Sequence, residues 1–299
     1  MNYDAIIYQN ILLEGQKERI AEEVLVNLKN LYYDLRIVAE QYDNKNLNEI
    51  YVIIRDLIDK HFNQMDSDLQ KQLELLGFVH QDFENELYSG IEESNNIPVT
   101  ALALSSAAMI ELIKKTNVVD RTYTQSITAN KKKLYDNVKN TVRFGLLNGQ
   151  DLSEINKNVK TKVNVTGRDM NNFIQTAVRS TLSDIEKEVL KKNKKLTTKE
   201  IYLAVLDPVT TDICIRNHGK IFEIGEGQQV PAHFGCRSLR LAYFGSKNNL
   251  TIDSNYNDFV RRTKKEGLKE TNSGNLEKGS VPKYSLETYE KKIMKNLES

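Results

Sequence analysis

The sequence contains no tryptophan, two cysteines and four prolines in 299 residues. The lack of tryptophan, and of aromatic residues interleaved with basic ones, excludes the pattern typical of proteins that stack nucleic-acid bases. Two thiols without the N-terminal pattern of a signal peptide lead us to expect a reducing compartment, with a disulfide between them as the second choice. The most apolar window, residues 97–113, contains Glu111 and is short for a bilayer. We therefore expect a soluble protein without a membrane segment.

The scarcity of proline favours long helices. The first 97 residues contain none, and neither does the stretch from Val99 to Asp207. Apolar residues recur there at spacings of three and four, which predicts amphipathic helices. Asp151 and Glu154 have the spacing of a capped helix start, and the polar stretch from Ser89 to Pro98 predicts a hinge.

The residue pattern changes after residue 200. Residues 202–206, 220–224 and 239–243 read as short strands, and the chain after Phe244 is polar and expected to be extended. The predicted fold class is mainly α, an elongated helical body with a small C-terminal α+β module and a polar tail. The predicted regions are an acidic helical region (1–97), a basic helical region (98–200), the α+β Cys/His module (201–244) and the polar tail (245–299).

A net charge of +1 conceals an uneven distribution of charge along the chain. Residues 1–100 carry 8 Lys and Arg against 19 Asp and Glu, whereas residues 101–200 carry 19 against 10. The acidic and basic parts suggest two surfaces with different partners, of which the basic one would face DNA phosphates. The alternative is that these charges simply lie on solvated helix faces. The candidate DNA contacts are two lysine runs: Lys131, Lys132, Lys133, Lys191, Lys192, Lys194 and Lys195.

Both cysteines and two of the four histidines lie within one short segment, as Cys214, His218, His233 and Cys236. Thr211 and its neighbours can cap a short helix on which Cys214 and His218, four residues apart, would share a face. Four such ligands are what a closed tetrahedral zinc site requires. The alternative is that the thiols are small buried side chains and the histidines form local hydrogen bonds.

The same segment offers weaker arguments for an enzyme. A Cys–His pair made by His233 with either cysteine could form a nucleophile, but no orienting third group or oxyanion hole is evident. A metal-dependent nuclease built on His218 or His233 lacks a clear set of carboxylates. We therefore expect no enzymatic activity.

The motif around the cysteines resembles the C-terminal signature of the tailed-phage minor head, or head-morphogenesis, family of Mu F-type proteins. That family reads Asp, a Thr/Ser-rich turn, Cys, Gly-Lys-hydrophobic-Phe, a loop, Pro, His and Cys-Arg. The matching residues here are Asp207, Thr211, Cys214, Gly219, Lys220, Phe222, Pro231, His233, Cys236 and Arg237. The helix containing Ala177-Val178-Arg179-Ser180-Thr181 is similar to the family's helical lead-in, whereas the family varies at the position of His218.

The resemblance implies a minor virion protein in multiple copies inside the capsid near the portal, made in the host cytoplasm during assembly. Its partners would be the portal protein, other head proteins and packaged DNA. It would assist head assembly, DNA packaging or ejection, and Lys220 and Arg237 would hold the module together or contact a partner. The rival hypotheses are a nuclease or transferase toxin, and a zinc-binding adaptor. The tail is short and polar for an added catalytic domain, and an adaptor would bind stoichiometric zinc without associating with phage heads.

Overall fold

A computed structural model of the protein describes residues 3–39, 46–95, 98–204 and 210–243. Its helices are α1 (Tyr3–Ala39), α2 (Leu47–Asn95), α3 (Ser106–Lys115), α4 (Tyr123–Leu147), α5 (Leu152–Lys192) and α6 (Asp212–Asn217). Its strands are β1 (Asn117–Val118), β2 (Arg121–Thr122), β3 (Lys199–Leu203), β4 (Ile221–Glu223) and β5 (Leu239–Ala242). This order confirms the predicted mainly α class with a small α+β module.

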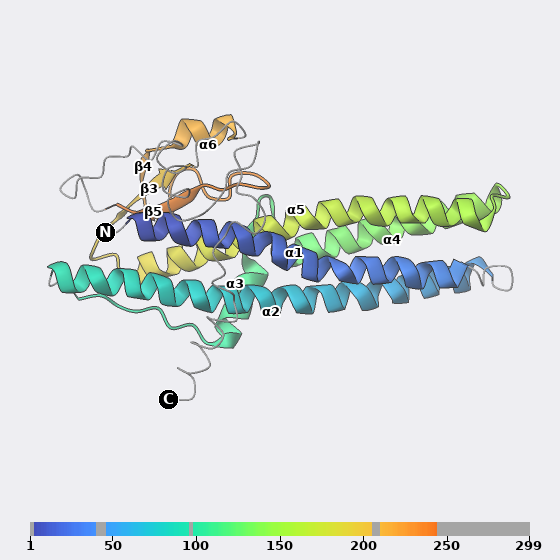
Figure 1. Ribbon diagram of the computed structural model, residues 1–299, viewed down its shortest axis with the longest axis horizontal. Helices are drawn as coiled ribbons and strands as arrows, with labels where there is room; N and C mark the ends of the chain where they lie inside the picture. The colour runs from blue at the N-terminus through green and yellow to red at the C-terminus, as the bar shows by residue number, and fades with distance from the viewer. Residues whose placement is uncertain (1–2, 40–45, 96–97, 205–209, 244–299) are drawn as a thin grey trace.

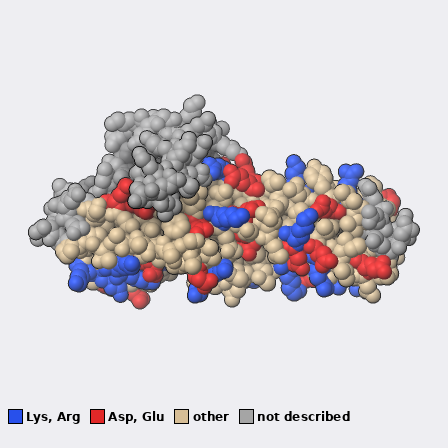
Figure 2. All heavy atoms as spheres, turned by 90° about the horizontal axis from the view of Figure 1, so that it is seen from below, with Lys and Arg blue, Asp and Glu red and all other residues tan. Residues whose placement is uncertain are grey.

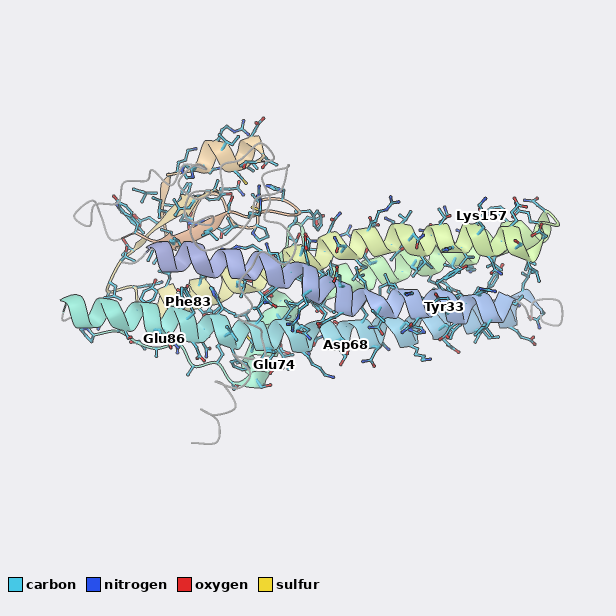
Figure 3. All side chains as sticks on the ribbon, viewed as in Figure 1. Tyr33, Asp68, Glu74, Phe83, Glu86 and Lys157 are labelled. Carbon is cyan, nitrogen blue, oxygen red and sulfur yellow. The ribbon has the colours of Figure 1, made fainter. Side chains whose placement is uncertain are left out.

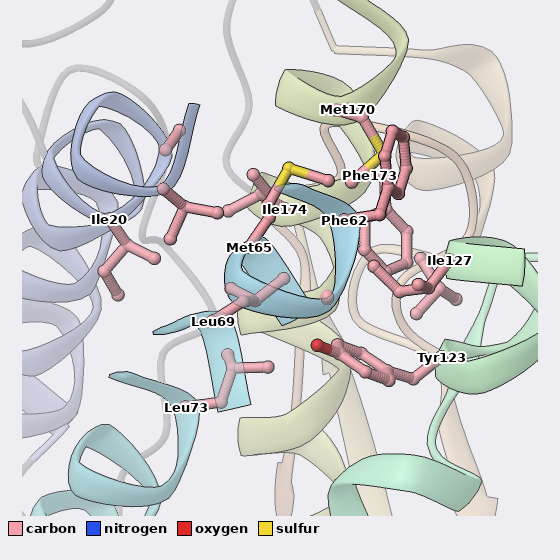
Figure 4. Close-up of a cluster of buried hydrophobic side chains, with 14 of the residues drawn as sticks. Ile20, Phe62, Met65, Leu69, Leu73, Tyr123, Ile127, Met170, Phe173 and Ile174 are labelled. Carbon is pink, nitrogen blue, oxygen red and sulfur yellow. The ribbon is translucent and has the colours of Figure 1, made fainter. Parts of the chain in front are cut away.

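Helices α1, α2, α4 and α5 run along the long axis of the molecule and form an elongated body (Figure 1). Their apolar stripes meet in one core, part of which is drawn in Figure 4. There Met65, Tyr123 and Phe173, from three different helices, are 0%, 1% and 2% exposed. The Tyr123 hydroxyl donates to Asp66 Oδ1 at 2.7 Å, so its burial leaves no polar group unpaired. The predicted acidic and basic helical regions therefore share a single core.

Within the stretch predicted as a hinge, α2 continues through Gly90 and ends at Asn95, and residues 96 and 97 lie outside the described residues. Within α2 the buried residues Phe62, Met65 and Leu69 follow one another in phase along one apolar stripe. One glycine in α2, Gly77, has a packing role. A Cβ there would lie 2.7 Å from Met109 Sδ, so the missing side chain lets α3 approach.

The segment 98–105 follows α2 and is held by two asparagine side chains. Asn85 donates to the Leu102 carbonyl and accepts from its amide, both at 2.8 Å. Asn193 pairs in the same way with Thr100, at 2.8 and 3.0 Å. Asn193 lies inside the second lysine run and is buried, so the middle of that run belongs to the core.

Helices α4 and α5 form an antiparallel hairpin with defined caps. Thr122 and Gln125 form a reciprocal capping box at the start of α4. Gly149 has a φ of 65° in the connection, and Asp151 Oδ1 accepts from the Glu154 amide at 2.8 Å. The predicted start of a helix at Asp151 is confirmed, and α5 then continues unbroken to Lys192.

The module is a three-stranded antiparallel sheet in the order β4-β3-β5, with α6 between β3 and β4 in the chain. The three strands lie where the sequence predicted them, to within a few residues. One face buries Ile201, Leu239 and Leu241 against Phe83 of α2. Figure 3 shows Phe83 on the part of the bundle next to the module, whereas Lys157 lies near its opposite end. The second face buries Tyr202 with Cys214 and Cys236.

The predicted polar tail, 245–299, lies outside the described residues. Within the described ranges, no helix is long and apolar enough to cross a membrane.

Candidate Cys/His site

The first cysteine is positioned by the connection between β3 and β4. Helix α6 begins after Thr211, and the Cys214 amide donates to the Thr211 carbonyl at 3.0 Å. Gly219, with a φ of 77°, then turns the chain back so that its amide donates to the Tyr202 carbonyl at 2.8 Å. The return of the chain onto β3 places Cys214 over the sheet face that carries Tyr202.

Three of the four predicted ligands converge. Cys214 Sγ lies 3.3 Å from His233 Nε2 and 3.8 Å from Cys236 Sγ. Both cysteines are free thiols and are 2% and 1% exposed. The His-x2-Cys turn is closed by the Cys236 amide, which donates to the His233 carbonyl at 3.2 Å. Two sulfurs and one imidazole nitrogen therefore face one another in a largely buried position.

The fourth predicted ligand, His218, is not part of this cluster. The sequence predicted that Cys214 and His218 share a helix face, but α6 ends at Asn217 and His218 is its C-cap, with a φ of −53° and a ψ of 128°. Helical spacing therefore does not apply to it, and its Nδ1 instead accepts from the Ala204 amide at 3.1 Å. Burial lowers the pKa of His218, which favours this neutral, accepting form.

The two thiols have very different acidities. The hydrogen bond with Cys236 lowers the pKa of Cys214 to about 4, with smaller contributions from the hydroxyls of Ser238, Thr211 and Tyr202 and against the effect of burial. The same hydrogen bond, together with burial, raises the pKa of Cys236. The site therefore favours a thiolate at Cys214, surrounded by hydrogen-bond donors.

A thiolate next to an imidazole also has the geometry of a Cys–His nucleophile. The structure supplies the orienting group that the sequence did not reveal, since His233 Nδ1 lies 2.8 Å from the Phe234 carbonyl. However, Cys214 is only 2% exposed. A nucleophile must reach its substrate, so this burial argues against covalent catalysis in this conformation.

The remaining motif residues build the walls of the module. Phe222 packs under the Arg240 guanidinium, 5.2 Å from ring centroid to Cζ, and Arg240 forms a buried ion pair with Glu200. A Cβ on Gly227 would lie 2.1 Å from the Phe222 ring, so only glycine fits there. The sequence analysis did not predict roles for Arg240, Glu200 or Gly227. The ion pair could have been inferred from the two opposite charges within apolar strands, Glu200 in β3 and Arg240 in β5.

Three further motif residues lie at the edge of the module or beyond the described ranges. Lys220 is exposed, with Nζ 3.5 Å from Asn217 Oδ1, and Arg237 is half-buried. Asp207 lies outside the described residues.

The module is anchored to the helical body by α5. The Nε of Arg179 donates to the Ser238 carbonyl at 3.1 Å, and the Gly235 amide donates to Thr176 Oγ1 at 3.2 Å. Arg179 is 2% exposed and its Nη2 lies 3.3 Å from both carboxylate oxygens of Glu186. The geometry of the Cys-Arg-Ser turn thus depends on a charged side chain buried within a long helix.

Residues 136–240 match the family described as Phage Mu protein F like protein. These residues form a Mu F-like region. The match confirms, for these residues, the resemblance inferred from the cysteine motif. No curated protein and no solved structure matches the chain.

The Mu F-like region begins within α4, includes all of α5 and most of the Cys/His module, and ends within β5. The Arg179–Ser238 and Thr176–Gly235 hydrogen bonds both lie inside it. The region therefore contains α5 and the end of α4 together with the module that α5 anchors, and it shares its core with α1, α2 and α3.

A second buried cluster of titratable side chains lies beside the Cys/His module. His80 Nε2 of α2 is 3.3 Å from Glu186 Oε1 and 3.9 Å from Glu84 Oε1. These three side chains could present donors to a metal ion, but the Arg179 guanidinium already contacts Glu186 and would repel a cation. The cluster is therefore a buried ion-pair network. It was not predicted from the sequence. The pattern that could have revealed it is a pair of opposite charges, Arg179 and Glu186, seven residues apart on the apolar stripe of α5.

The carboxyls of this network titrate differently. Burial raises the pKa of Glu84 to about 7, although His80 opposes the shift. For Glu186 burial acts in the same direction, but the positive charge of Arg179 and the His80 hydrogen bond outweigh it and lower the pKa. Glu186 is therefore the charged partner of Arg179, and Glu84 changes protonation near neutral pH.

The two lysine runs differ in their surroundings. Lys131, Lys132 and Lys133 form ion pairs with Asp59, Asp136 and Asp169 at 2.9, 2.6 and 2.8 Å. The Lys131–Asp59 pair joins α4 to α2, so part of the charge asymmetry is neutralised within the bundle. Figure 2 shows Lys and Arg interspersed with Asp and Glu over one face of the bundle.

In the second lysine run, Lys191 pairs with Glu188 at 2.6 Å. Lys192, Lys194 and Lys195 are exposed at the end of α5. No ion pair involves these three within the described part of the chain.

Proposed function

We propose that this protein is a minor virion component that binds the portal inside the phage head and assists head assembly, DNA packaging or ejection. The observation that carries the proposal is the Mu F-like region, with its module fixed to α5 by Arg179. The elongated body and the module at one side of it (Figure 1) support a role in bridging two components of the head. Several copies around a portal ring would satisfy this geometry.

The DNA part of the proposal rests on charge. Lys192, Lys194 and Lys195 are exposed and lie within the Mu F-like region, so they can approach phosphates without first breaking an ion pair with any described residue. The first lysine run, by contrast, is already paired with aspartates. Contact with packaged DNA would therefore be non-specific and centred on the end of α5.

Portal binding tests the main proposal. The full chain is co-expressed with the portal protein encoded beside its gene, and the complex is isolated through a tag on the portal. We expect co-purification that survives moderate salt, and the portal of an unrelated phage, at equal concentration, serves as the control. Equal recovery with both portals, or recovery with neither, would refute portal association.

A second measurement tests residence in the virion. Purified phage particles are analysed for this chain before and after DNA release. We expect the chain in intact, nuclease-treated heads. Its absence from mature particles would restrict the protein to an assembly role outside the virion and contradict the proposal.

A further inference from the structure

We propose that Cys214, His233 and Cys236 hold a zinc ion through three protein ligands, without His218. Tetrahedral zinc with Zn–S bonds of about 2.3 Å and Zn–N bonds of about 2.05 Å separates two sulfurs by about 3.8 Å, and a sulfur and a nitrogen by about 3.5 Å. The observed Sγ–Sγ and Sγ–Nε2 distances from Cys214 are 3.8 and 3.3 Å. The two distances from Cys214 therefore match a tetrahedral zinc site, and all three donor atoms lie within 4.8 Å of one another.

The imidazole is oriented as a zinc ligand. His233 Nδ1 lies 2.8 Å from the Phe234 carbonyl, which can only accept, so Nδ1 carries the proton. Nε2 then presents its lone pair, and this is the nitrogen that faces Cys214 Sγ. A backbone carbonyl on the second ring nitrogen is the usual outer partner of a metal-bound histidine.

The sulfur of Cys214 also has an outer partner. The Tyr202 hydroxyl, on the neighbouring strand β3, donates to Cys214 Sγ at 3.4 Å. Thr211 provides a second hydroxyl, with Oγ1 2.9 Å from His233 Nε2, although Thr211 occupies the N-cap position and its side chain makes no cap bond to α6. The Tyr202 hydroxyl orients the Cys214 sulfur, whereas the Thr211 hydroxyl donates to the Nε2 lone pair that zinc would take. On zinc binding, the Thr211 hydroxyl would turn to a zinc-bound water.

The fourth coordination position belongs to a water molecule. Among the described residues, no fourth His, Cys, Asp or Glu joins the cluster. His218, which the spacing favoured, is engaged with the Ala204 amide. Two thiolates and one imidazole suit zinc better than magnesium or calcium, which prefer oxygen ligands.

Zinc at this site would stabilise the module. Cys214 comes from α6, whereas His233 and Cys236 come from the turn that leads into β5. That turn also carries the Gly235 and Ser238 contacts to α5. One ion would thus join the two sides of the module next to its anchor on the helical body, a role independent of portal binding.

The test uses the full chain, purified under reducing conditions, with metal measured by mass spectrometry and affinity by competition with a chelator. We expect about one zinc per chain in the wild type, as three ligands from one tetrahedral site require. C214S, H233N and C236S should each lose zinc or weaken its binding at least tenfold, whereas the matched control H218N should retain it. Zinc loss by H218N, or undiminished binding by the other variants, would overturn the three-ligand set.

Cobalt substitution of the wild-type chain avoids dependence on variants that fail to fold. Cobalt bound at this site should give the visible spectrum of tetrahedral coordination together with thiolate-to-metal charge-transfer bands. Zinc should abolish these bands at one equivalent. An octahedral spectrum, or no spectrum in the folded wild-type protein, would overturn the proposal.

Discussion

The Nε–H of Arg179 in α5 donates to the backbone carbonyl of Ser238, 3.1 Å away and 59 residues later in the chain. The other side of the same guanidinium faces Glu186, which in turn contacts His80 of α2. One buried side chain therefore connects the ion-pair network of the bundle with the turn that carries Cys236. The position of the Cys/His site relative to the helices depends on this connection.

Replacing Arg179 by methionine should destabilise the protein by about 3–5 kcal/mol, because it leaves the buried Glu186 carboxylate without its charged partner. It also removes the donor to Ser238, so the module should loosen before the bundle unfolds. The free energy of unfolding is measured by urea titration, and module loosening by the rate at which a thiol reagent modifies Cys214. Arg143 in α4 is exposed, and R143M, as the control, should change the free energy of unfolding by less than about 0.5 kcal/mol. Equal Cys214 modification rates in R179M and the wild type would contradict the anchoring role.

The buried carboxyl of Glu84 should make stability depend on pH near neutrality. Its folded pKa of about 7 exceeds the ordinary value of 4.5. The folded state thus holds the proton more tightly, and the stabilising contribution is full below about pH 4.5 and is lost as the pH rises through about 7. The expected loss is on the order of 3 kcal/mol.

The test of this dependence compares E84Q with the wild type between pH 5 and 8. A neutral amide cannot ionise, so E84Q should flatten the decline in the free energy of unfolding. E86Q is the matched control, since Glu86 lies two residues away on the exposed side of α2 (Figure 3), and it should keep the wild-type decline. An unchanged profile in E84Q would assign the pH dependence to other groups.

The sequence predicted the helical class, the three strands and the Asp151 cap because those depend on local spacing and capping. It failed at Gly90, where a glycine within a polar stretch indicated a break. Helix α2 continues there, at the end of a helix whose earlier turns are buried in the bundle. The shared core of the two helical regions was equally hidden, since an apolar stripe does not specify its partner.

The candidate site was predicted in part for the same reason. Residue type and spacing selected Cys214, His233 and Cys236 correctly as neighbours. His218 was placed with them by helical spacing, but the helix ends one residue too early for that spacing to hold. Arg179 and Glu84 act across helices, and long-range pairing of this kind leaves no local pattern.

Two glycines in the loop after β4 allow backbone strain to be separated from packing. Gly225 and Gly227 have φ values of 86° and 73°. A Cβ on Gly225 would meet nothing within 4 Å, whereas on Gly227 it would lie 2.1 Å from the Phe222 ring. G225A should cost about 1–2 kcal/mol from the positive φ alone. G227A should cost about 1–3 kcal/mol more, because Phe222 must leave the Arg240 guanidinium. Thermal and urea unfolding of both variants checks this difference, and equal losses would show that the Phe222 packing contributes nothing.

The exposed lysines at the end of α5 should carry whatever affinity the protein has for DNA. The triple variant K192Q/K194Q/K195Q should weaken binding to duplex DNA and reduce the salt dependence of log K by about 0.9 for each lysine–phosphate pair that the substitutions remove. The matched variant K131Q/K132Q/K133Q removes the same charge from residues that already pair with Asp59, Asp136 and Asp169. It should therefore bind DNA nearly as well as the wild type.

Fluorescence anisotropy across a salt series measures the slope of log K for both variants, and circular dichroism checks that both variants fold. If the affinity of the two variants falls equally, net charge alone governs binding, and the assignment of DNA binding to the end of α5 is wrong.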